Sequence, residues 1–484
     1  MRYTAIALDY DGTIARDGEV PAHVLDGLRR LRASGRKLLL VTGRELEELL
    51  GVFPGIEVFD RVVAENGALL YRPDTGERRE LGEPPPGTLI DALKASGIPL
   101  SVGHTILATI RPHEAVVLRA IADLGLEQQV IFNKGAVMCL PAGCNKASGL
   151  RHALAELGLS PRNVVAAGDG ENDHALLDMS EYAVATANAI DTLKDAADRV
   201  TQSPRGDGVL EVIEGLLDCD LAAYPPKKRR RALCLGNDLE GNEVILPSRR
   251  ASLVIVGDRR HTTLLGTAIL ARLCKAGYQV CVLDTRGDYL DFRQAVVFGT
   301  LDNPPAVAEV LTALEKPDVH TVVCLAAVPE AERRNFLERL LVPLRQLRAQ
   351  TGRPHWILVD EAHNVLPASV AVDESASEGA ENTIYASDDP SALSPTVLAA
   401  VDGIAACGPG AAALLESLAR ALAWDAAPMP PRDAREDEAL VWFRGVEKPL
   451  AIIGIERMKE EPKPATKPEK REKSLEVGQV LRRA

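Results

Sequence analysis

The stretch from Leu8 to Thr13 constrains this chain more than any other part of its sequence. The short apolar run Met1–Leu8 predicts a buried strand, and it ends in two aspartates one residue apart, Asp9 and Asp11. The glycine that follows permits an abrupt turn. Two carboxylates crowded at a strand end repel each other, and a bound divalent cation such as Mg²⁺, which prefers oxygen ligands and a substrate phosphate, would compensate. Taken alone, the pair is explained equally well by a turn that caps the next helix.

The segments that follow alternate between helical and strand patterns. Apolar residues in 21–34 have helical spacing, and the continuous apolar run Lys37–Val41 predicts a strand that ends in Thr42 and Gly43. Strands that alternate with helices predict an α/β fold, here a doubly wound, Rossmann-like parallel sheet with its site at the carboxyl ends of the strands. Asp9, Asp11 and Thr42 all lie at such ends.

Three prolines, Pro84 to Pro86, interrupt this alternation. Between there and about residue 133 the sequence predicts two helices, 88–95 and 113–125, with strands near 100–110, which indicates a small α+β cap inserted at about 82–135. We expect the core alternation to resume with the strand 137–141. The cap would then determine which substrate reaches the core.

Further polar motifs follow in the resumed alternation. Asn145 and Lys146 begin a predicted helix, and the apolar strand 164–167 ends in Asp169 and, four residues later, Asp173. Two acids, a hydroxyl, a lysine and two more acids suit phosphoryl transfer, because one carboxylate can attack phosphorus while a second moves the proton of the leaving group. Distal acids would complete a Mg²⁺ site. Each residue also has a structural explanation, such as a helix cap, a surface charge or a turn residue.

Four of these segments together resemble the motifs of the haloacid dehalogenase superfamily. The segments are Asp9-Tyr10-Asp11-Gly12-Thr13, Val41-Thr42-Gly43-Arg44, Asn145-Lys146-Ala147-Ser148 and Gly168-Asp169-Gly170-Glu171-Asn172-Asp173. The pattern is most similar to the branch with Cof-like proteins, sucrose phosphatases and archaeal phosphoglycolate phosphatases, whose cap lies between the second and third motifs. Residues 65–68 and 185–189 resemble that branch as well.

The resemblance, over about residues 1–218, implies a role for each motif residue. It implies that Asp9 is the nucleophile and Asp11 the acid and base. It also implies Mg²⁺ as cofactor, held by Asp9, the Asp11 backbone carbonyl and Asp169 with support from Asp173. The substrate-binding set that it implies consists of Thr42, Gly43, Lys146 and Asn172.

Composition limits the partners and the cell compartment. The formal charge of −13 argues against a protein that coats nucleic acid through its overall field, but it does not exclude a local basic face. Eight scattered cysteines without metal-finger spacing indicate reduced thiols. No signal peptide and no apolar run of about 20 residues is found, so we expect a cytoplasmic protein without a membrane span.

The 484 residues leave room for a second domain. We expect a first domain over residues 1–220, a basic linker over 221–231, a second α/β domain over 232–458 and a charged tail over 459–484. The basic run in 227–231 has a second interpretation as a nucleic-acid or targeting segment. The acidic, Ser/Ala-rich stretch 372–394 predicts a disordered loop inside the second domain.

The second domain resembles P-loop ATPases of the DNA-translocase and helicase kind. An apolar strand that ends in Asp360 and Glu361 is similar to a Walker B element. The phosphate loop after Gly257 fails, because the lysine that should precede the hydroxyl of Thr262 is absent. We therefore expect a degenerate nucleotide-binding fold without ATP hydrolysis, in which Arg259, Arg260 and His261 could still bind an anion.

Two functional hypotheses of different classes follow. The first is a Mg²⁺-dependent phosphatase acting on a small phosphorylated metabolite, such as a sugar phosphate or phosphoglycolate, with the second domain used for assembly or regulation. The alternative is an oligomeric nucleotide- or nucleic-acid-binding protein with an accessory phosphatase. A phosphotransferase or mutase would share the aspartyl-phosphate chemistry.

Overall fold

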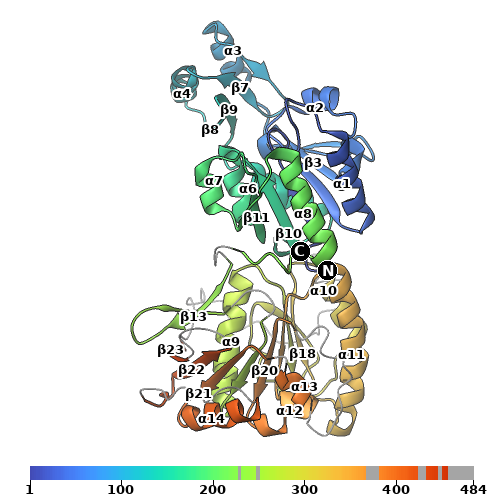
Figure 1. Ribbon diagram of the computed structural model, residues 1–484, viewed down its shortest axis with the longest axis vertical. Helices are drawn as coiled ribbons and strands as arrows, with labels where there is room; N and C mark the ends of the chain where they lie inside the picture. Colours follow the sequence, from blue (N-terminus) through green and yellow to red (C-terminus); the bar gives the residue numbers. More distant parts are fainter. Residues whose placement is uncertain are drawn as a thin grey trace, which may run out of the picture. The chain divides into compact units, whose positions relative to one another are not determined.

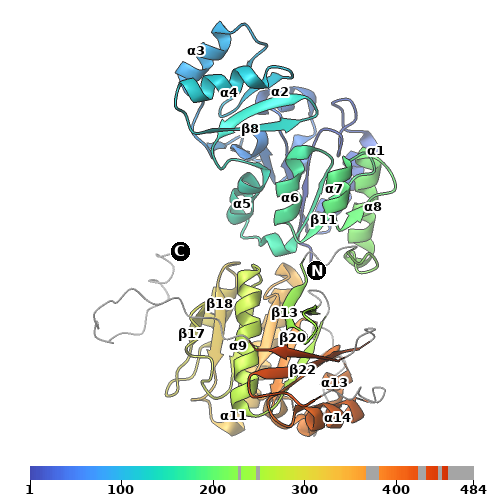
Figure 2. The same ribbon diagram turned by 90° about the vertical axis from the view of Figure 1, so that its left-hand side faces the viewer.

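The chain divides into two compact units, Met1–Arg230 with Ala349–Gly352, and Arg231–Arg348 with Arg353–Ala484. A computed structural model gives the structure of the protein, and each unit is considered separately (Figures 1 and 2). The structure describes residues 1–226, 231–246, 251–366, 381–399, 401–422, 432–444 and 450–455. Part of the predicted linker (227–230), part of the predicted acidic loop (372–380) and the predicted tail (459–484) lie outside these ranges.

The first unit is built on an eight-stranded sheet in the order β12-β11-β10-β1-β2-β3-β4-β5. Pairing is parallel from β12 to β3 and antiparallel at the last two strands. The strands are β1 (Ala5–Leu8), β2 (Lys37–Val41), β3 (Arg61–Ala64), β4 (Leu69–Tyr71), β5 (Arg78–Glu80), β10 (Val164–Gly168), β11 (Tyr182–Ala185) and β12 (Arg199–Val200).

Helices cover both faces of this sheet because alternate strand residues point to opposite sides. Ile6 and Leu8 of β1 pack with α1 (Ala22–Ala33) and α8 (Arg205–Cys219), whereas Ala5 and Ala7 pack on the other face. The remaining helices of this core are α2 (Leu46–Val52), α5 (Lys146–Glu156), α6 (His174–Met179) and α7 (Asp191–Ala196). All four residues of β1 are therefore buried, whichever face of the sheet they point to.

A small α+β cap is inserted between β5 and α5. Its antiparallel sheet has the order β6-β7-β9-β8, and two helices bury their apolar side chains against it. The elements are α3 (Gly87–Ala95), β6 (Ser101–Val102), β7 (Leu107–Ile110), α4 (Glu114–Asp123), β8 (Gln128–Asn133) and β9 (Ala136–Pro141).

The cap is larger than the sequence indicated. We expected residues 137–141 to rejoin the core, but β9 pairs with β7 and β8 and therefore belongs to the cap. The cause is a two-residue turn at Lys134 and Gly135, both with positive φ, which folds β9 back onto β8. Such turns join antiparallel neighbours, whereas a parallel sheet needs a crossover.

The second unit contains a nine-stranded sheet in its described residues, in the order β17-β18-β16-β19-β20-β15-β21-β22-β23. The first seven strands are parallel and the last two are antiparallel. The strands are β15 (Leu253–Val256), β16 (Val280–Asp284), β17 (Ala295–Phe298), β18 (His320–Cys324), β19 (Trp356–Val359), β20 (Thr383–Ser387), β21 (Gly403–Cys407), β22 (Glu438–Phe443) and β23 (Leu450–Gly454).

Two hydrophobic cores lie on opposite faces of this sheet. One packs around α9 and a separate hairpin, and the other around the remaining long helices. The hairpin consists of β13 (Leu233–Asn237) and β14 (Glu243–Leu246), and the helices are α9 (Arg259–Lys275), α10 (Val307–Leu314), α11 (Glu330–Thr351), α12 (Ala362–Val365), α13 (Pro395–Ala399) and α14 (Ala411–Ala421). No described helix is both long enough and apolar enough to span a membrane.

The prediction of a disordered loop over 372–394 is wrong for its described part. Residues 383–387 form β20, a buried strand between β15 and β19. The Thr-Ile-Tyr sequence at its start has high strand propensity, and pairing on both sides outweighs the acidic, serine-rich surroundings. None of the eight cysteines is in a disulfide in this structure.

Candidate active site

The candidate site lies where β1, β10 and β2 end side by side. Strand β1 pairs in parallel with β10 through Leu8 and Ala167. Asp9 follows the last residue of β1 and Asp169 follows the last residue of β10, so both lie at one edge of the sheet. Strand β2 is the other neighbour of β1 and delivers Thr42 to the same edge. The side chains of Asp9, Asp169 and Thr42 are all buried. The topology thus brings together motifs that are far apart in the sequence.

Lys146 provides the positive charge at the centre of the site. Its ammonium lies 2.6 Å from Asp9 Oδ1 and 2.6 Å from Asp173 Oδ1, and the side chain is fully buried. Lys146 is the first residue of α5, which begins at Asn145 with a capping box closed by Ser148. The cap fixes the start of the helix and with it the position of this lysine.

Asp173 is occupied by donors at both carboxylate oxygens. Oδ1 accepts from Lys146, and Oδ2 accepts from the backbone N–H groups of Asp169 and Gly170, each at 2.9 Å. These bonds fold the loop after β10 so that Asp169 faces Asp9. Asp173 therefore acts on the site through the two groups that it holds in place.

Burial and charge shift the proton affinities of these groups. Burial, with the charge of Asp173, raises the pKa of Asp9 to about 7 against the opposing effect of Lys146. Burial alone would lower the pKa of Lys146, but Asp173 and Asp9 outweigh it and the pKa is raised. Burial also raises the pKa of Asp169, in opposition to Lys134. An excess of negative charge is thus held at this edge of the sheet.

These oxygens are suited to a divalent cation. Asp9, Asp169 and Asp173 each place a carboxylate oxygen within 4.8 Å of the others. Since the oxygens of Asp173 already accept from other groups, the available ligands are Asp9, Asp169 and the backbone carbonyl of Asp11. That carbonyl and Asp169 Oδ2 both accept from the ammonium of Lys134, so a cationic group already lies between them. An all-oxygen donor set of this kind fits Mg²⁺.

The side chain of Asp11 is turned to a different partner. Its two carboxylate oxygens accept from the Arg44 guanidinium, with Nε to Oδ2 at 2.6 Å and Nη2 to Oδ1 at 2.7 Å. Arg44 also lies over the ring of Tyr10. The resemblance implied the backbone carbonyl of Asp11 as a metal ligand, and in the structure this carbonyl and Asp169 Oδ2 both accept from the same ammonium, that of Lys134.

Polar groups from two further loops line the site next to Thr42. The hydroxyl of Thr42 accepts from the Arg44 backbone N–H at 3.1 Å. Asn172 donates to Asn66 Oδ1 at 2.9 Å, and a side chain at Gly43 would meet Asn172 within 3.3 Å. Asn172 Oδ1 and Asn66 Nδ2 are buried and have no hydrogen-bond partner among the residues that the structure describes. A polar ligand would satisfy such atoms.

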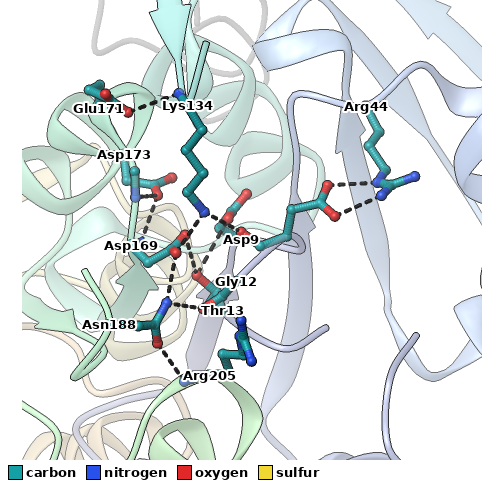
Figure 3. Close-up of polar contacts among 12 residues, drawn as sticks. Asp9, Gly12, Thr13, Arg44, Lys134, Asp169, Glu171, Asp173, Asn188 and Arg205 are labelled. Carbon is teal, nitrogen blue, oxygen red and sulfur yellow. Dashed lines mark hydrogen bonds and ion pairs between the residues drawn. The ribbon is translucent and has the colours of Figure 1, made fainter. Parts of the chain in front are cut away.

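Sequence reasoning missed three residues of this site. Lys134 enters from the cap, as Figure 3 shows, with its ammonium 2.7 Å from Asp169 Oδ2. Asn188 donates to the Gly12 carbonyl and to Asp169 Oδ2, both at 2.9 Å. Asn188 lies in the segment 185–189 noted above, so a signal existed for it, and Asn66 lies in the turn 65–68. The sequence around Lys134 signals a hairpin but no contact with the core.

The second unit has acids at the ends of its own parallel strands, after β16 and β19. Glu361 Oε2 accepts from the Thr285 hydroxyl at 2.5 Å, and Arg286 forms an ion pair with Glu361. Burial, with the charges of Asp284 and Asp288, raises the pKa of Asp360 to about 7.

The other residues of the predicted nucleotide site lie beyond the intervening strand β20. Thr262 is on α9, its hydroxyl donates to the Arg259 carbonyl, and Gly257 follows β15. Within the described residues, no hydrogen bond joins Thr262 to Asp360 or Glu361. The charged groups at this edge are joined in separate pairs, Arg286 with Glu361 and Arg259 with Asp288, whereas Lys146 bridges two acids in the first unit.

Comparison with known proteins identifies relatives of the first unit. Residues 6–80 and 129–213 match the family model described as haloacid dehalogenase-like hydrolase. The chain is 32% identical over 225 residues to a phosphoglycolate phosphatase of Natronomonas pharaonis, a match that covers 44% of this chain and 97% of that protein. A phosphoglycolate phosphatase of Aeropyrum pernix is 34% identical over 226 residues, covering 44% and 92% of the two chains. One of Methanothermobacter thermautotrophicus is 30% identical over 219 residues, covering 43% and 96%.

Proposed function

Because this chain belongs to the haloacid dehalogenase-like hydrolases through its first unit, we propose that Asp9 is the nucleophile of a Mg²⁺-dependent reaction on a small phosphorylated metabolite. The family makes the chain a phosphoric monoester hydrolase. The proposal adds the residues that act, the metal and the kind of substrate.

The reaction has two steps on phosphorus. A carboxylate oxygen of Asp9 attacks the phosphorus, the bond from phosphorus to the ester oxygen breaks, and an aspartyl-phosphate forms. Asp11 gives a proton to the departing alkoxide and then takes one from the water that hydrolyses the aspartyl-phosphate. Since Arg44 engages both oxygens of Asp11, the Asp11 carboxylate must exchange this partner for the leaving group during the reaction.

Lys146 binds the transferred phosphoryl group. An ammonium has three N–H donors, and two of them are directed at Asp9 and Asp173. The third is free for a phosphoryl oxygen beside Asp9. We propose that Thr42, Gly43 and Asn172 line the rest of the phosphate pocket. Two buried atoms there, Asn172 Oδ1 and Asn66 Nδ2, have no hydrogen-bond partner among the described residues and could bind a polar ligand.

The cation would be held by Asp9, Asp169 and the Asp11 backbone carbonyl. When bound, Mg²⁺ would offset the repulsion between the anionic nucleophile and the anionic phosphate. The relatives named above are phosphoglycolate phosphatases, so we propose phosphoglycolate or a similarly small phosphorylated acid or sugar as the substrate class.

The observation that carries this proposal is the buried bridge from Asp9 through Lys146 to Asp173. Replacement of a buried ion pair by well-packed apolar residues is often neutral or stabilising, so stability alone is a weak reason to keep such a bridge. Burial raises the pKa of Asp9 to about 7, and the positive charge of a bound cation would lower it and favour the carboxylate that attacks phosphorus.

The test is phosphate release by the full chain from a panel of phosphomonoesters, with Mg²⁺ and with a chelator. We expect turnover only with Mg²⁺, and we expect Asp9→Asn to lower the rate by more than about 10⁴-fold. Asp26→Asn, a matched change at an exposed aspartate of α1, should leave the rate unchanged. Full activity of Asp9→Asn would contradict the assignment, and transfer of phosphate to a second hydroxyl without release would favour a mutase.

For the second unit we propose a nucleotide-binding module that no longer hydrolyses ATP and that serves assembly or regulation. Support comes from the loop between β15 and α9 and from the acids after β19, two strands away in the sheet. The missing lysine argues against hydrolysis. An ATP titration of the full-length Asp9→Asn variant tests this. We expect binding without release of the γ-phosphate, whereas steady ATP turnover would contradict the proposal.

A further inference from the structure

Lys134 occupies the tip of the cap hairpin in a conformation that lysine rarely adopts. Asn133 and Ala136 are the last paired residues of β8 and β9, so Lys134 and Gly135 alone make the turn. Their φ values are 47° and 92°, as in the turns that favour Asn-Gly. A lysine held in the left-handed region is an outlier of the kind that clusters at functional sites.

The turn directs the lysine side chain out of the cap and into the core. Its ammonium donates to Asp169 Oδ2 at 2.7 Å and to the Asp11 backbone carbonyl at 2.9 Å. Figure 3 shows Lys134 reaching down from the cap toward Asp169. The backbone N–H of Lys134 donates to Glu171 Oε2 at 3.3 Å, in the loop that carries Asp169. The hairpin tip is thus attached to the core at this loop.

The two oxygens that Lys134 binds are two of the ligands available to a divalent cation. With every group ionised, the acids of the cluster carry three negative charges and Lys146 carries one positive charge. Lys134 reduces the remaining excess from two charges to one. A divalent cation would reduce it to zero, and then no charge would be left for Lys134 to neutralise.

We propose that Lys134 is an internal counter-cation, so that Mg²⁺ and this contact of the cap exclude each other. The inference rests on the proposed Mg²⁺ dependence. Two cations that share one pair of oxygens repel each other, so Mg²⁺ must displace the ammonium from Asp169 and the Asp11 carbonyl. The cap hairpin is attached to the core in the metal-free protein and is released when the metal binds.

The surroundings of the two lysines of the site differ in the way this role requires. The Lys134 side chain is 43% exposed, and its ammonium can leave Asp169 for water without being buried elsewhere. The Lys146 side chain has no exposed surface and binds two carboxylates. Lys146 is therefore fixed, whereas Lys134 is the exchangeable cation.

The test is a calorimetric Mg²⁺ titration of the full chain without substrate. We expect Lys134→Gln to bind Mg²⁺ about five- to tenfold more tightly than the natural protein, because the metal no longer displaces a charge. Lys134→Arg, which keeps the charge, should bind Mg²⁺ as the natural protein does. Lys94→Gln, at an exposed lysine of cap helix α3, controls for the change in net charge and should have no effect.

Hydrogen exchange of residues 128–141 gives a second measurement. We expect Mg²⁺ to speed amide exchange in this hairpin of the natural protein and to have no such effect in Lys134→Gln. Equal or weaker Mg²⁺ binding by Lys134→Gln would overturn the inference and leave the proposed function intact. If the natural protein does not bind Mg²⁺, the proposed metal dependence and this inference both fail.

Discussion

Each of the two units gathers acids at the carboxyl ends of parallel strands, and they neutralise these acids differently. In the first unit a buried lysine bridges Asp9 and Asp173. In the second unit Asp284 is occupied by backbone donors, since Oδ1 accepts from the N–H groups of residues 286–288 and Oδ2 from that of Tyr289. Glu361 meets an arginine and a threonine.

This difference shows that the position of an acid in the fold does not by itself determine its chemical role. Parallel α/β sheets bring polar loops together at one edge whatever the protein does. Asp284 shows how such an acid can simply stabilise its own loop. Among the described residues, the side chain of Asp9 accepts from Lys146 and, at 3.4 Å, from the Thr13 hydroxyl, so its second oxygen is weakly engaged and available. The neighbours of an acid, more than its place at a strand end, distinguish a reactive group from a structural one.

The largest test of this comparison is removal of the bridging lysine. Lys146→Met should lower phosphate release by about 10³-fold, because a donor to the transferred group is lost. It should also destabilise the first unit by about 3–5 kcal/mol, since two buried carboxylates would face each other. In the second unit, Arg286→Met should cost only about 1 kcal/mol, because its side chain is partly exposed and Glu361 keeps Thr285.

Calorimetric unfolding of the full chain measures these losses. The three tryptophans, Trp356, Trp424 and Trp442, all belong to the second unit, so tryptophan fluorescence assigns its transition. Equal destabilisation by Lys146→Met and Arg286→Met would show that the two acidic edges are energetically alike and would break the comparison.

A second test uses the pH dependence of Asp360. Its pKa is about 7 in the folded unit against an ordinary value of 3.8, so the folded unit holds this proton more tightly than the unfolded chain. Stability of the second unit should therefore fall as pH rises from about 4 to about 7, and stay lower above that range. Asp360→Asn removes this loss and should stabilise the unit at pH 8 by up to about 4 kcal/mol, with little effect at pH 4.

Urea unfolding followed by tryptophan fluorescence at the two pH values measures this effect. Asp302→Asn, at an exposed aspartate of the same unit, is the matched control and should not change stability at either pH. A stabilisation by Asp360→Asn that is the same at pH 4 and pH 8 would show that the buried charge is not its source.

The smallest test compares two arginine–aspartate pairs with the same forked geometry. Arg44 pairs with Asp11 in the first unit and Arg259 pairs with Asp288 in the second. The Arg44 side chain is 18% exposed and that of Arg259 is 53% exposed. Arg44→Lys should cost the first unit about 1 kcal/mol, and Arg259→Lys should cost the second unit less, because water screens an exposed pair. The same calorimetric experiment applies, and the reverse order would contradict this ranking.

Local sequence patterns predicted the carboxyl ends of the core strands better than they predicted which sheet the other strands join. The apolar runs before Asp9, Thr42 and Asp169 are continuous and end in polar motifs, so both ends of each strand are marked. The run 137–141 looks the same, yet it is a cap strand, because the turn at Lys134 and not its own residues decides its partner. Strand β20 was missed because its neighbours are acidic and rich in serine.

The catalytic acids and the lysine of the candidate site could be predicted from the sequence, because their order along the chain indicates one kind of chemistry. Acids and a lysine in a fixed order suggest phosphoryl transfer before any fold is known. The orientation of Asp11 toward Arg44 and the arrival of Lys134 from the cap depend on how separate elements pack. Such contacts across elements leave no periodic signal in the sequence.

The bridge between Asp9 and Lys146 has a consequence for the synthesis of the chain. These residues are 137 positions apart, and ribosomes add about 5–20 residues per second. For about 7–27 s the growing chain therefore carries Asp9 without its lysine, and β1 without its neighbour β10. During that interval the nascent polypeptide exposes an unpaired edge of β1, which is the kind of surface that chaperones bind.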